Sequence, residues 1–223
     1  MSAESRPDVF QPTIAALAAT REIVQDLLAE DGVRDYLSKL HAHHQESWEH
    51  SLRVGHLAAD LGVLDRLERQ EWRLLACAGL LHDIGKLRIP QEVLLRVGLL
   101  DPESREVMRE HSRLGFEFLG DLVPITVRRI VVAHHEFCRD PYPRGATAAG
   151  TVDGQPERRE TDLRILRLAE MVAVADMFDA LIHRRSYKPA LSRAETERLL
   201  SQEFTGDARY VEEILERCAG PDE

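Results

Sequence analysis

The chain has 223 residues, of which 43% are hydrophobic and 30% charged, with a formal net charge of −10. This composition is ordinary for a globular protein, and the acidic charge argues against binding a nucleic-acid polymer, which requires an excess of Lys and Arg. The three cysteines form no CxxC pair. There is no uncharged apolar run long enough to cross a membrane, and the amino terminus does not resemble a signal peptide. We therefore expect a cytoplasmic protein without disulfides or membrane contact.

Apolar residues recur at helical spacing along most of the chain, and no pair of alternating strands stands out, so the predicted fold class is all-α. Residues 1–12 are expected to form a loose tail. The glycines and prolines between residues 137 and 162 predict a long irregular loop. Helices are expected over residues 13–31, 33–41, 44–61 (ending at Gly62), 64–81, 102–119, 124–135, 163–183, 192–204 and 207–218.

These elements predict an N-terminal helical extension over residues 1–43 and a main domain over residues 44–223. In the extension, Leu17, Val24 and Leu28 form an apolar stripe. This stripe could pair two copies of the chain, so a homodimer through the N-terminal helices is one expectation.

The stretch Leu81-His82-Asp83-Ile84-Gly85-Lys86 follows an apolar run that begins at Leu74. Burying a charged group is costly unless the group has a partner or a metal. We interpret His82 and Asp83 as neighbouring metal ligands and Lys86 as the charged group beside them.

Other imidazoles and carboxylates lie on the apolar faces of the expected helices. Glu46 and His50 are four residues apart, one helical turn from each other. Imidazole and carboxylate together suit an open catalytic site for iron, manganese or zinc, built between facing helices. The candidate metal ligands are Glu46, His50, His82, Asp83, His111, His134, His135 and Asp176.

Two of these ligands come as adjacent pairs, His82-Asp83 and His134-His135. Neighbours on a helix point about 100° apart, so both can reach one centre only near a helix end or between two metals. The set is too large for one ion with open positions, whereas two or three ions about 3.5–4 Å apart, bridged by Asp83, would fit. Such a site lowers the pKa of a bridging water and holds a phosphoryl oxygen, which is the chemistry of phosphoester hydrolysis.

Simpler interpretations exist for each residue alone. A single core histidine is more often a hydrogen-bonded structural residue than a ligand. Asp179 is better suited to contact a metal ligand than to bind the metal itself. His43 or His44 could lie just outside the ring of metal ligands. The positive charges of Arg184, Arg185 and Lys188 can be explained by the partial negative charge at a helix C-terminus.

The order of His50, the stretch from His82 to Lys86, His111, His134-His135 and Asp176 resembles the HD phosphohydrolase superfamily. The details resemble its HD-GYP branch, the bacterial phosphodiesterases of cyclic di-GMP. Matching features are Ile89-Pro90, Gly115 four residues after His111, the run from Ala173 to Leu181 and the run from Arg185 to Ser192. The resemblance covers about residues 44 to 215.

This resemblance implies an HD-domain helical bundle with a buried di- or trinuclear metal site, with iron or manganese bound. It implies that the eight candidates are ligands, with Glu46 serving a third metal. Lys86 and Asp83 would take part in catalysis. The substrate would be bound by Arg185, Lys188, Tyr187 and Tyr142.

Three features depart from the family pattern, one of them a loop from Pro143 to Ala169 that is about a dozen residues longer than usual. The name-giving stretch is degenerate here, reading Phe-Cys-Arg-Asp-Pro-Tyr-Pro over residues 137–143, and Glu170 stands where the family usually has Arg. We predict a metal-dependent phosphodiesterase that hydrolyses cyclic di-GMP to linear pGpG, GMP or both through a metal-bridging hydroxide. The alternatives are an HD phosphohydrolase for another nucleotide and a weakly active cyclic di-GMP-binding signalling module.

Overall fold

The computed structural model describes residues 14–143, 156–183 and 191–217. Within these ranges the regular structure is helical, with one isolated β-bridge between Cys138 and Phe204, which confirms the all-α prediction. The elements are α1 (Ile14–Ala29), α2 (Asp31–His43), α3 (Gln45–Leu64), α4 (Arg69–Leu81), the 3-10 helix η1 (Ile84–Arg88), α5 (Gln91–Leu94), α6 (Pro102–Arg109), α7 (His111–Leu119), the 3-10 helix η2 (Gly120–Leu122), α8 (Ile125–Ala133), α9 (Pro156–Ile182), α10 (Arg193–Glu203) and α11 (Ala208–Arg217).

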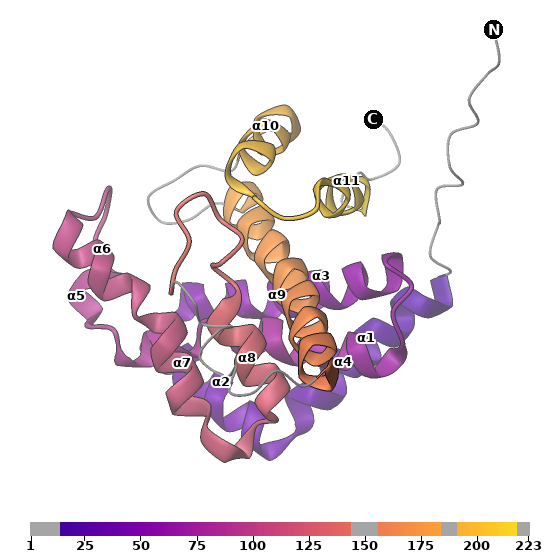
Figure 1. Ribbon diagram of the computed structural model, residues 1–223. Helices are drawn as coiled ribbons and strands as arrows, with labels where there is room; N and C mark the ends of the chain where they lie inside the picture. Colours follow the sequence, from indigo (N-terminus) through magenta and orange to yellow (C-terminus); the bar gives the residue numbers. More distant parts are fainter. Residues whose placement is uncertain (1–13, 144–155, 184–190, 218–223) are drawn as a thin grey trace, which may run out of the picture.

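One hydrophobic core joins most of these helices, and α5 and α6 contribute no buried residue to it. The long helix α9 crosses the middle of the bundle and packs against α3, α4 and α8, while α5 and α6 project at one side (Figure 1). The N-terminal helices share the same core, because Val24 of α1 and Leu40 of α2 are fully buried in it. Of the stripe that could pair two copies, Val24 lies in this core and Leu28 packs against it. The domain boundary at residue 43 stays a prediction.

Helices α3 and α4 cross where two glycines meet. A Cβ atom on Gly79 would lie 2.8 Å from the Cα atom of Gly55, so a larger residue at this crossing would push the helices apart. The close crossing brings His50 of α3 towards His82 at the end of α4, and their ring centroids are 5.1 Å apart.

The predicted end of α3 at Gly62 is wrong, because the helix continues to Leu64. Gly62 lies inside the helix and leaves room for α4. A Cβ atom there would lie 2.8 Å from Leu75 Cδ1 and 3.0 Å from Trp72 Cδ1. This glycine serves packing rather than helix termination.

The predicted start of α4 at Leu64 is also wrong. The chain turns at Arg66, whose φ angle is 56°, and α4 begins only at Arg69. Glu68 and Glu71 form a capping box there, which satisfies backbone N–H groups of the first turn. The capping residues, and not the apolar spacing, mark where this helix begins.

Two further expectations need correction. The single helix expected over residues 102–119 is two helices, α6 and α7, with a break at Glu110. Helix α9 begins at Pro156, inside the segment expected to be irregular, and proline is well suited to the first turn of a helix. The break at Glu110 matters for the site, because it makes His111 the first residue of α7.

The degenerate stretch after His135 is anchored to the segment between α10 and α11. The N–H of Arg139 donates to the Glu203 carbonyl (2.9 Å), and the N–H of Thr205 donates to the Phe137 carbonyl (2.9 Å). Glu170, another departure from the family pattern, accepts a hydrogen bond from the backbone N–H of Asp207, just before α11. These two departures therefore have structural partners at the C-terminal end of the bundle.

Across the described ranges, none of the helices combines the length and the apolar character needed to cross a bilayer.

Candidate metal centre

A close contact between η1 and α7 sets the first part of the site. His82 follows the last residue of α4 and Asp83 precedes η1, so this adjacent pair lies at a helix end as predicted. A Cβ atom on Gly85 would lie 1.8 Å from the carbonyl oxygen of His111 and 2.5 Å from the backbone nitrogen of Gly115. Glycine alone allows this approach. The contact places Asp83 Oδ1 3.5 Å from His111 Nε2.

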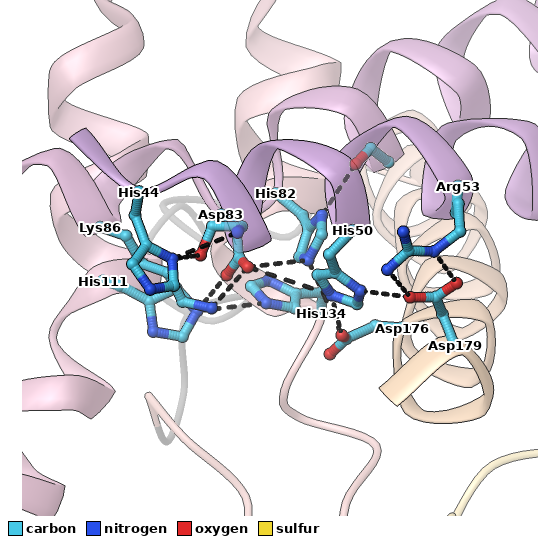
Figure 2. Close-up of polar contacts among 12 residues, drawn as sticks. His44, His50, Arg53, His82, Asp83, Lys86, His111, His134, Asp176 and Asp179 are labelled. Atoms are coloured by element: carbon cyan, nitrogen blue, oxygen red, sulfur yellow. Dashed lines mark hydrogen bonds and ion pairs between the residues drawn. The ribbon is translucent and has the colours of Figure 1, made fainter. Parts of the chain in front are cut away.

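Seven of the eight predicted ligands come together in three overlapping groups, and within each group the ligand atoms lie within 4.8 Å of one another. They are supplied by α3, the end of α4, the start of α7, the end of α8 and α9, and Figure 2 shows most of them converging. The groups are His50, His82 and Asp83; His82, His134 and Asp176; and His111, His134 and His135.

Glu46 is the predicted ligand that belongs to none of these groups among the described residues. It lies one turn before His50 on α3 and lines the cavity beside that histidine. Its assignment to a third metal stays a prediction.

Three of the histidines are oriented by the same kind of local hydrogen bond. The Nδ1 atom of each lies within hydrogen-bond distance of the backbone carbonyl three residues earlier, and that atom must be the protonated one, since a carbonyl only accepts. Each ring then keeps an unprotonated Nε2 atom, with a lone pair directed into the site. The contacts are His82 to Gly79 (2.8 Å), His111 to Met108 (2.8 Å) and His134 to Val131 (2.6 Å).

These lone pairs fit a cation. In the part of the chain that the structure describes, the buried Nε2 atom of His82 has no hydrogen-bond partner. The Nε2 atoms of His111 and His134 lie 3.4 Å apart, and both are acceptors when both rings donate through Nδ1. Buried polar atoms are rarely left unpaired, and two facing lone pairs repel each other unless a positive charge lies between them. The donor set therefore suits divalent metal ions.

Burial also keeps the imidazoles in the form that binds metals. It lowers the pKa of His111 to about 4 and that of His134 to about 3. The pKa values of His82 and His135 are lowered by the same main cause. Neutral imidazole is the state required of a ligand, so these side chains need not lose a proton at neutral pH before binding.

The Asp83 carboxyl group is ionised despite its burial. Burial alone would raise its pKa, but the neighbouring Lys86 ammonium outweighs that effect and holds the pKa well below its usual range. Lys86 Nζ lies 2.5 Å from Asp83 Oδ2. The two oxygens of Asp83 face different histidines, since Oδ1 is 3.5 Å from His111 Nε2 and Oδ2 is 3.5 Å from His82 Nε2. A carboxylate in this position is able to join two cations.

His50 lies between two further carboxylates. Its Nε2 atom is 2.8 Å from Asp176 Oδ1, and its Nδ1 atom is 2.7 Å from Asp179 Oδ2. Burial alone would lower the pKa of His50, but the two carboxylates outweigh it and raise the pKa. Asp179 in turn accepts hydrogen bonds from Arg53 Nε (2.8 Å) and from a terminal nitrogen of the same guanidinium (3.0 Å). Asp179 thus contacts a candidate ligand, as predicted for a partner.

Arg53 was missed by the sequence analysis. The available signal was its position on α3, three residues after His50 and therefore on the same side of the helix. Arg53 also lines a cavity of about 340 Å³ that reaches His50 and Lys86 and is bordered by His44 and Met108. His44 precedes α3 and accepts a hydrogen bond from the Ser47 N–H (3.2 Å), so it is a capping residue at the mouth of the cavity.

The predicted substrate contacts fall into two groups. Tyr142 stacks on His135, with ring centroids 4.4 Å apart and planes at 25°, and lies beneath the Arg109 guanidinium. With Asp140 it lines a separate depression. Arg185, Tyr187 and Lys188 lie outside the described residues, and their roles stay predictions.

Several known proteins are similar to this chain in sequence. The cyclic di-GMP phosphodiesterase of Thermotoga maritima is 35% identical over 147 residues, which is 64% of this chain and 36% of that protein. The response regulator RpfG of Xanthomonas campestris, also named a cyclic di-GMP phosphodiesterase, is 34% identical over 142 residues, or 62% of this chain and 34% of that protein. The 3'3'-cGAMP-specific phosphodiesterase 2 of Vibrio cholerae is 30% identical over 190 residues, or 82% of this chain and 34% of that protein. This chain spans about a third of the length of these relatives.

A solved structure shares the fold. The HD domain of the L. monocytogenes phosphodiesterase PgpH in complex with cyclic-di-AMP superimposes with a TM-score of 0.54 and 18% identity, covering 81% of this chain and 92% of that one. The model of the HD domain family matches residues 47–181, more than half of the chain. The resemblance expected from the motifs is confirmed, and the chain belongs to the HD-domain family.

Proposed function

We propose that this chain is a metal-dependent phosphodiesterase that hydrolyses a cyclic dinucleotide, with cyclic di-GMP as the first-choice substrate and linear pGpG, GMP or both as product. The convergence of buried imidazoles and carboxylates, with the buried Nε2 atom of His82 lacking a hydrogen-bond partner among the described residues, carries this proposal. The relatives that are named phosphodiesterases of cyclic dinucleotides support it.

The residues proposed to hold the ions are His50, His82, Asp83, His111, His134, His135 and Asp176, with Asp83 as the bridge and Glu46 available to a third ion. Divalent ions bound there would supply Lewis acidity and lower the pKa of a bound water. Iron or manganese is the expected metal, and zinc also accepts these ligands.

The chain's own side chains would handle charge and protons. Lys86 lines the cavity beside Asp83, so its ammonium group can stabilise negative charge developing on the phosphate or give a proton to the leaving oxygen. Arg185 and Lys188 would clamp the substrate phosphates, because an Arg side chain offers a two-pronged hydrogen-bond fork. Tyr142 would act indirectly, by holding the ring of His135 in place.

A second substrate, 3'3'-cGAMP, is favoured by one observation. The relative named as specific for that nucleotide aligns over 82% of this chain, more than the two named for cyclic di-GMP. The cytoplasmic location and the homodimer stay predictions.

The test is turnover by purified protein reconstituted with Fe²⁺ or Mn²⁺ in the absence of oxygen. Cyclic di-GMP, 3'3'-cGAMP, cyclic di-AMP and a panel of nucleoside phosphates are offered, with metal-free protein and His82→Ala as controls. Hydrolysis of a cyclic dinucleotide by the loaded wild type alone is the expected result. Binding of cyclic di-GMP without cleavage would favour the signalling module, and cleavage of nucleoside phosphates alone would favour another phosphohydrolase.

A further inference from the structure

A second depression continues from the metal cavity towards α5 and the residues that follow it. Its volume is about 490 Å³, and it adds His43, Gln45, Leu95, Arg96 and Val97 to the lining. The two hollows share the residues His44, Glu46, Glu49 and Leu94. A molecule with one end at the metal ligands can therefore extend into the second depression, and the combined space is in the range of drug-sized ligand pockets, about 300–1,000 Å³.

The walls of this second depression have contrasting chemistry. On one side, Leu95 and Val97 are 63% and 76% exposed. Large apolar side chains exposed together beside a site often mark a surface that a ligand covers. On the other side, α3 presents the carboxylates of Glu46 and Glu49, which follow the same helical face as His50 and Arg53. Arg96 lies between Leu95 and Val97 in the chain, lines the same depression and is paired with Asp101. Exposed apolar side chains facing carboxylates suit a flat aromatic group with hydrogen-bond donors on its edge.

We propose that this second depression binds the base of the nucleotide unit farther from the metals, and that Glu49 selects guanine over adenine there. The inference rests on the proposed function, because it takes a cyclic dinucleotide as the ligand. Guanine carries two neighbouring donors, N1–H and N2–H, which match the two oxygens of a carboxylate. Adenine has a lone pair at N1, which a carboxylate repels.

The residues around Glu49 hold its carboxylate in place and leave it able to accept further hydrogen bonds. Gln45, one turn earlier on α3, donates from Nε2 to Glu49 Oε1 (2.8 Å) and so restricts the carboxylate. A carboxylate has about four acceptor positions, so this bond leaves capacity for a base edge. Glu49 also lines both hollows, whereas Leu95 and Val97 border only the second. Leu95 and Val97 are placed to contact the faces of the base while Glu49 reads its edge.

The experiment compares wild type, Glu49→Gln and the matched control Glu92→Gln, which removes an exposed carboxylate from α5 outside both linings. The ratio of kcat/KM for cyclic di-GMP to that for cyclic di-AMP is measured on metal-loaded protein, with metal content determined in parallel. A well-placed base contact discriminates about tenfold to a hundredfold, so the ratio should favour cyclic di-GMP in wild type and fall by about tenfold or more in Glu49→Gln. The change should lie in KM, with metal content unchanged and Glu92→Gln like wild type.

The mixed nucleotide 3'3'-cGAMP gives a second readout. Its two phosphodiester bonds differ, and guanine held in the far subsite presents only one of them to the metals. Wild type should therefore form mainly one of the two linear products, and Glu49→Gln should form both.

The inference is overturned if wild type shows no guanine preference, or if Glu49→Gln keeps the preference or slows both substrates equally. If wild type hydrolyses neither nucleotide, the proposed function fails and the subsite is judged by calorimetric binding of the same two nucleotides. Guanine-selective binding that is lost in Glu49→Gln would then support the subsite, and equal binding of the two nucleotides would refute it.

Discussion

The contact between η1 and α7 makes a demanding prediction for Gly85→Ala. The new methyl carbon would lie 1.8 Å from the His111 carbonyl oxygen and 2.5 Å from the Gly115 backbone nitrogen. Both obstacles are backbone atoms, which cannot rotate away as the end of a side chain can. Relief therefore requires η1 and α7 to separate.

The expected cost follows from that geometry. Overpacking a core typically destabilises by about 1–3 kcal/mol and sometimes more, and a backbone clash belongs at the upper end. For a chain of this size, about 3 kcal/mol corresponds to a fall in Tm of roughly 6–12 °C. The separation also moves Asp83 away from His111, whose Nε2 atom now lies 3.5 Å from Asp83 Oδ1, so metal binding should weaken as well.

The assay is thermal and urea unfolding of metal-free protein, followed by metal quantification. Gly32→Ala is the matched control, because nothing lies within 4 Å of a Cβ atom at that position inside α2. There, in the first turn of α2, the same substitution should not lower stability, because alanine has a higher helix propensity than glycine. If Gly85→Ala were as stable as wild type and held as much metal, the close approach of η1 to α7 would be refuted.

Three further predictions concern the site itself. Asp179→Asn should weaken metal binding about 10–100-fold, because the side chain that orients His50 is altered. A chelator competition should show no such change for Asp35→Asn, which alters an exposed residue of α2. Lys86→Ala should reduce turnover about 100-fold or more at unchanged metal content, and metal loss would contradict its role. The metal-free protein should lose stability as the pH falls from about 6.5 towards 4. In the folded protein the pKa values of His111 and His134 are about 4 and about 3, so both rings stay neutral over most of this range. The same histidines bind protons in the unfolded chain, and this favours unfolding. Tm at pH 7.5 and pH 5 measures this, and an unchanged Tm would count against buried neutral imidazoles.

The helical class, and most of the side chains that converge at the candidate metal centre, could be predicted from the sequence for a physical reason. Helical periodicity reports which face is buried, and an imidazole or carboxylate on that face needs a partner, as at His50 and Asp176. Adjacent candidates such as His82 and Asp83 were expected near a helix end or between two metals, and the structure places this pair at a helix end.

Other features depended on tertiary contacts that local patterns do not encode. A glycine such as Gly62 is typical of a helix end, but Gly62 lies within α3, where it leaves room for α4 to pack. The break at Glu110 was hidden within a continuous helical pattern. Arg53 carries no motif by itself, and its importance appears only where it meets Asp179, 126 residues later in the chain.

The most direct test of the metal centre is the number of divalent ions bound per chain. Wild-type protein is reconstituted with Mn²⁺ or Fe²⁺, desalted and analysed by inductively coupled plasma mass spectrometry beside His134→Ala, since His134 belongs to two of the three ligand groups. We predict about two or more ions per wild-type chain, as in sites where a carboxylate joins neighbouring ions, and a clear loss in the variant. A wild-type chain that retains no metal after reconstitution would contradict the account.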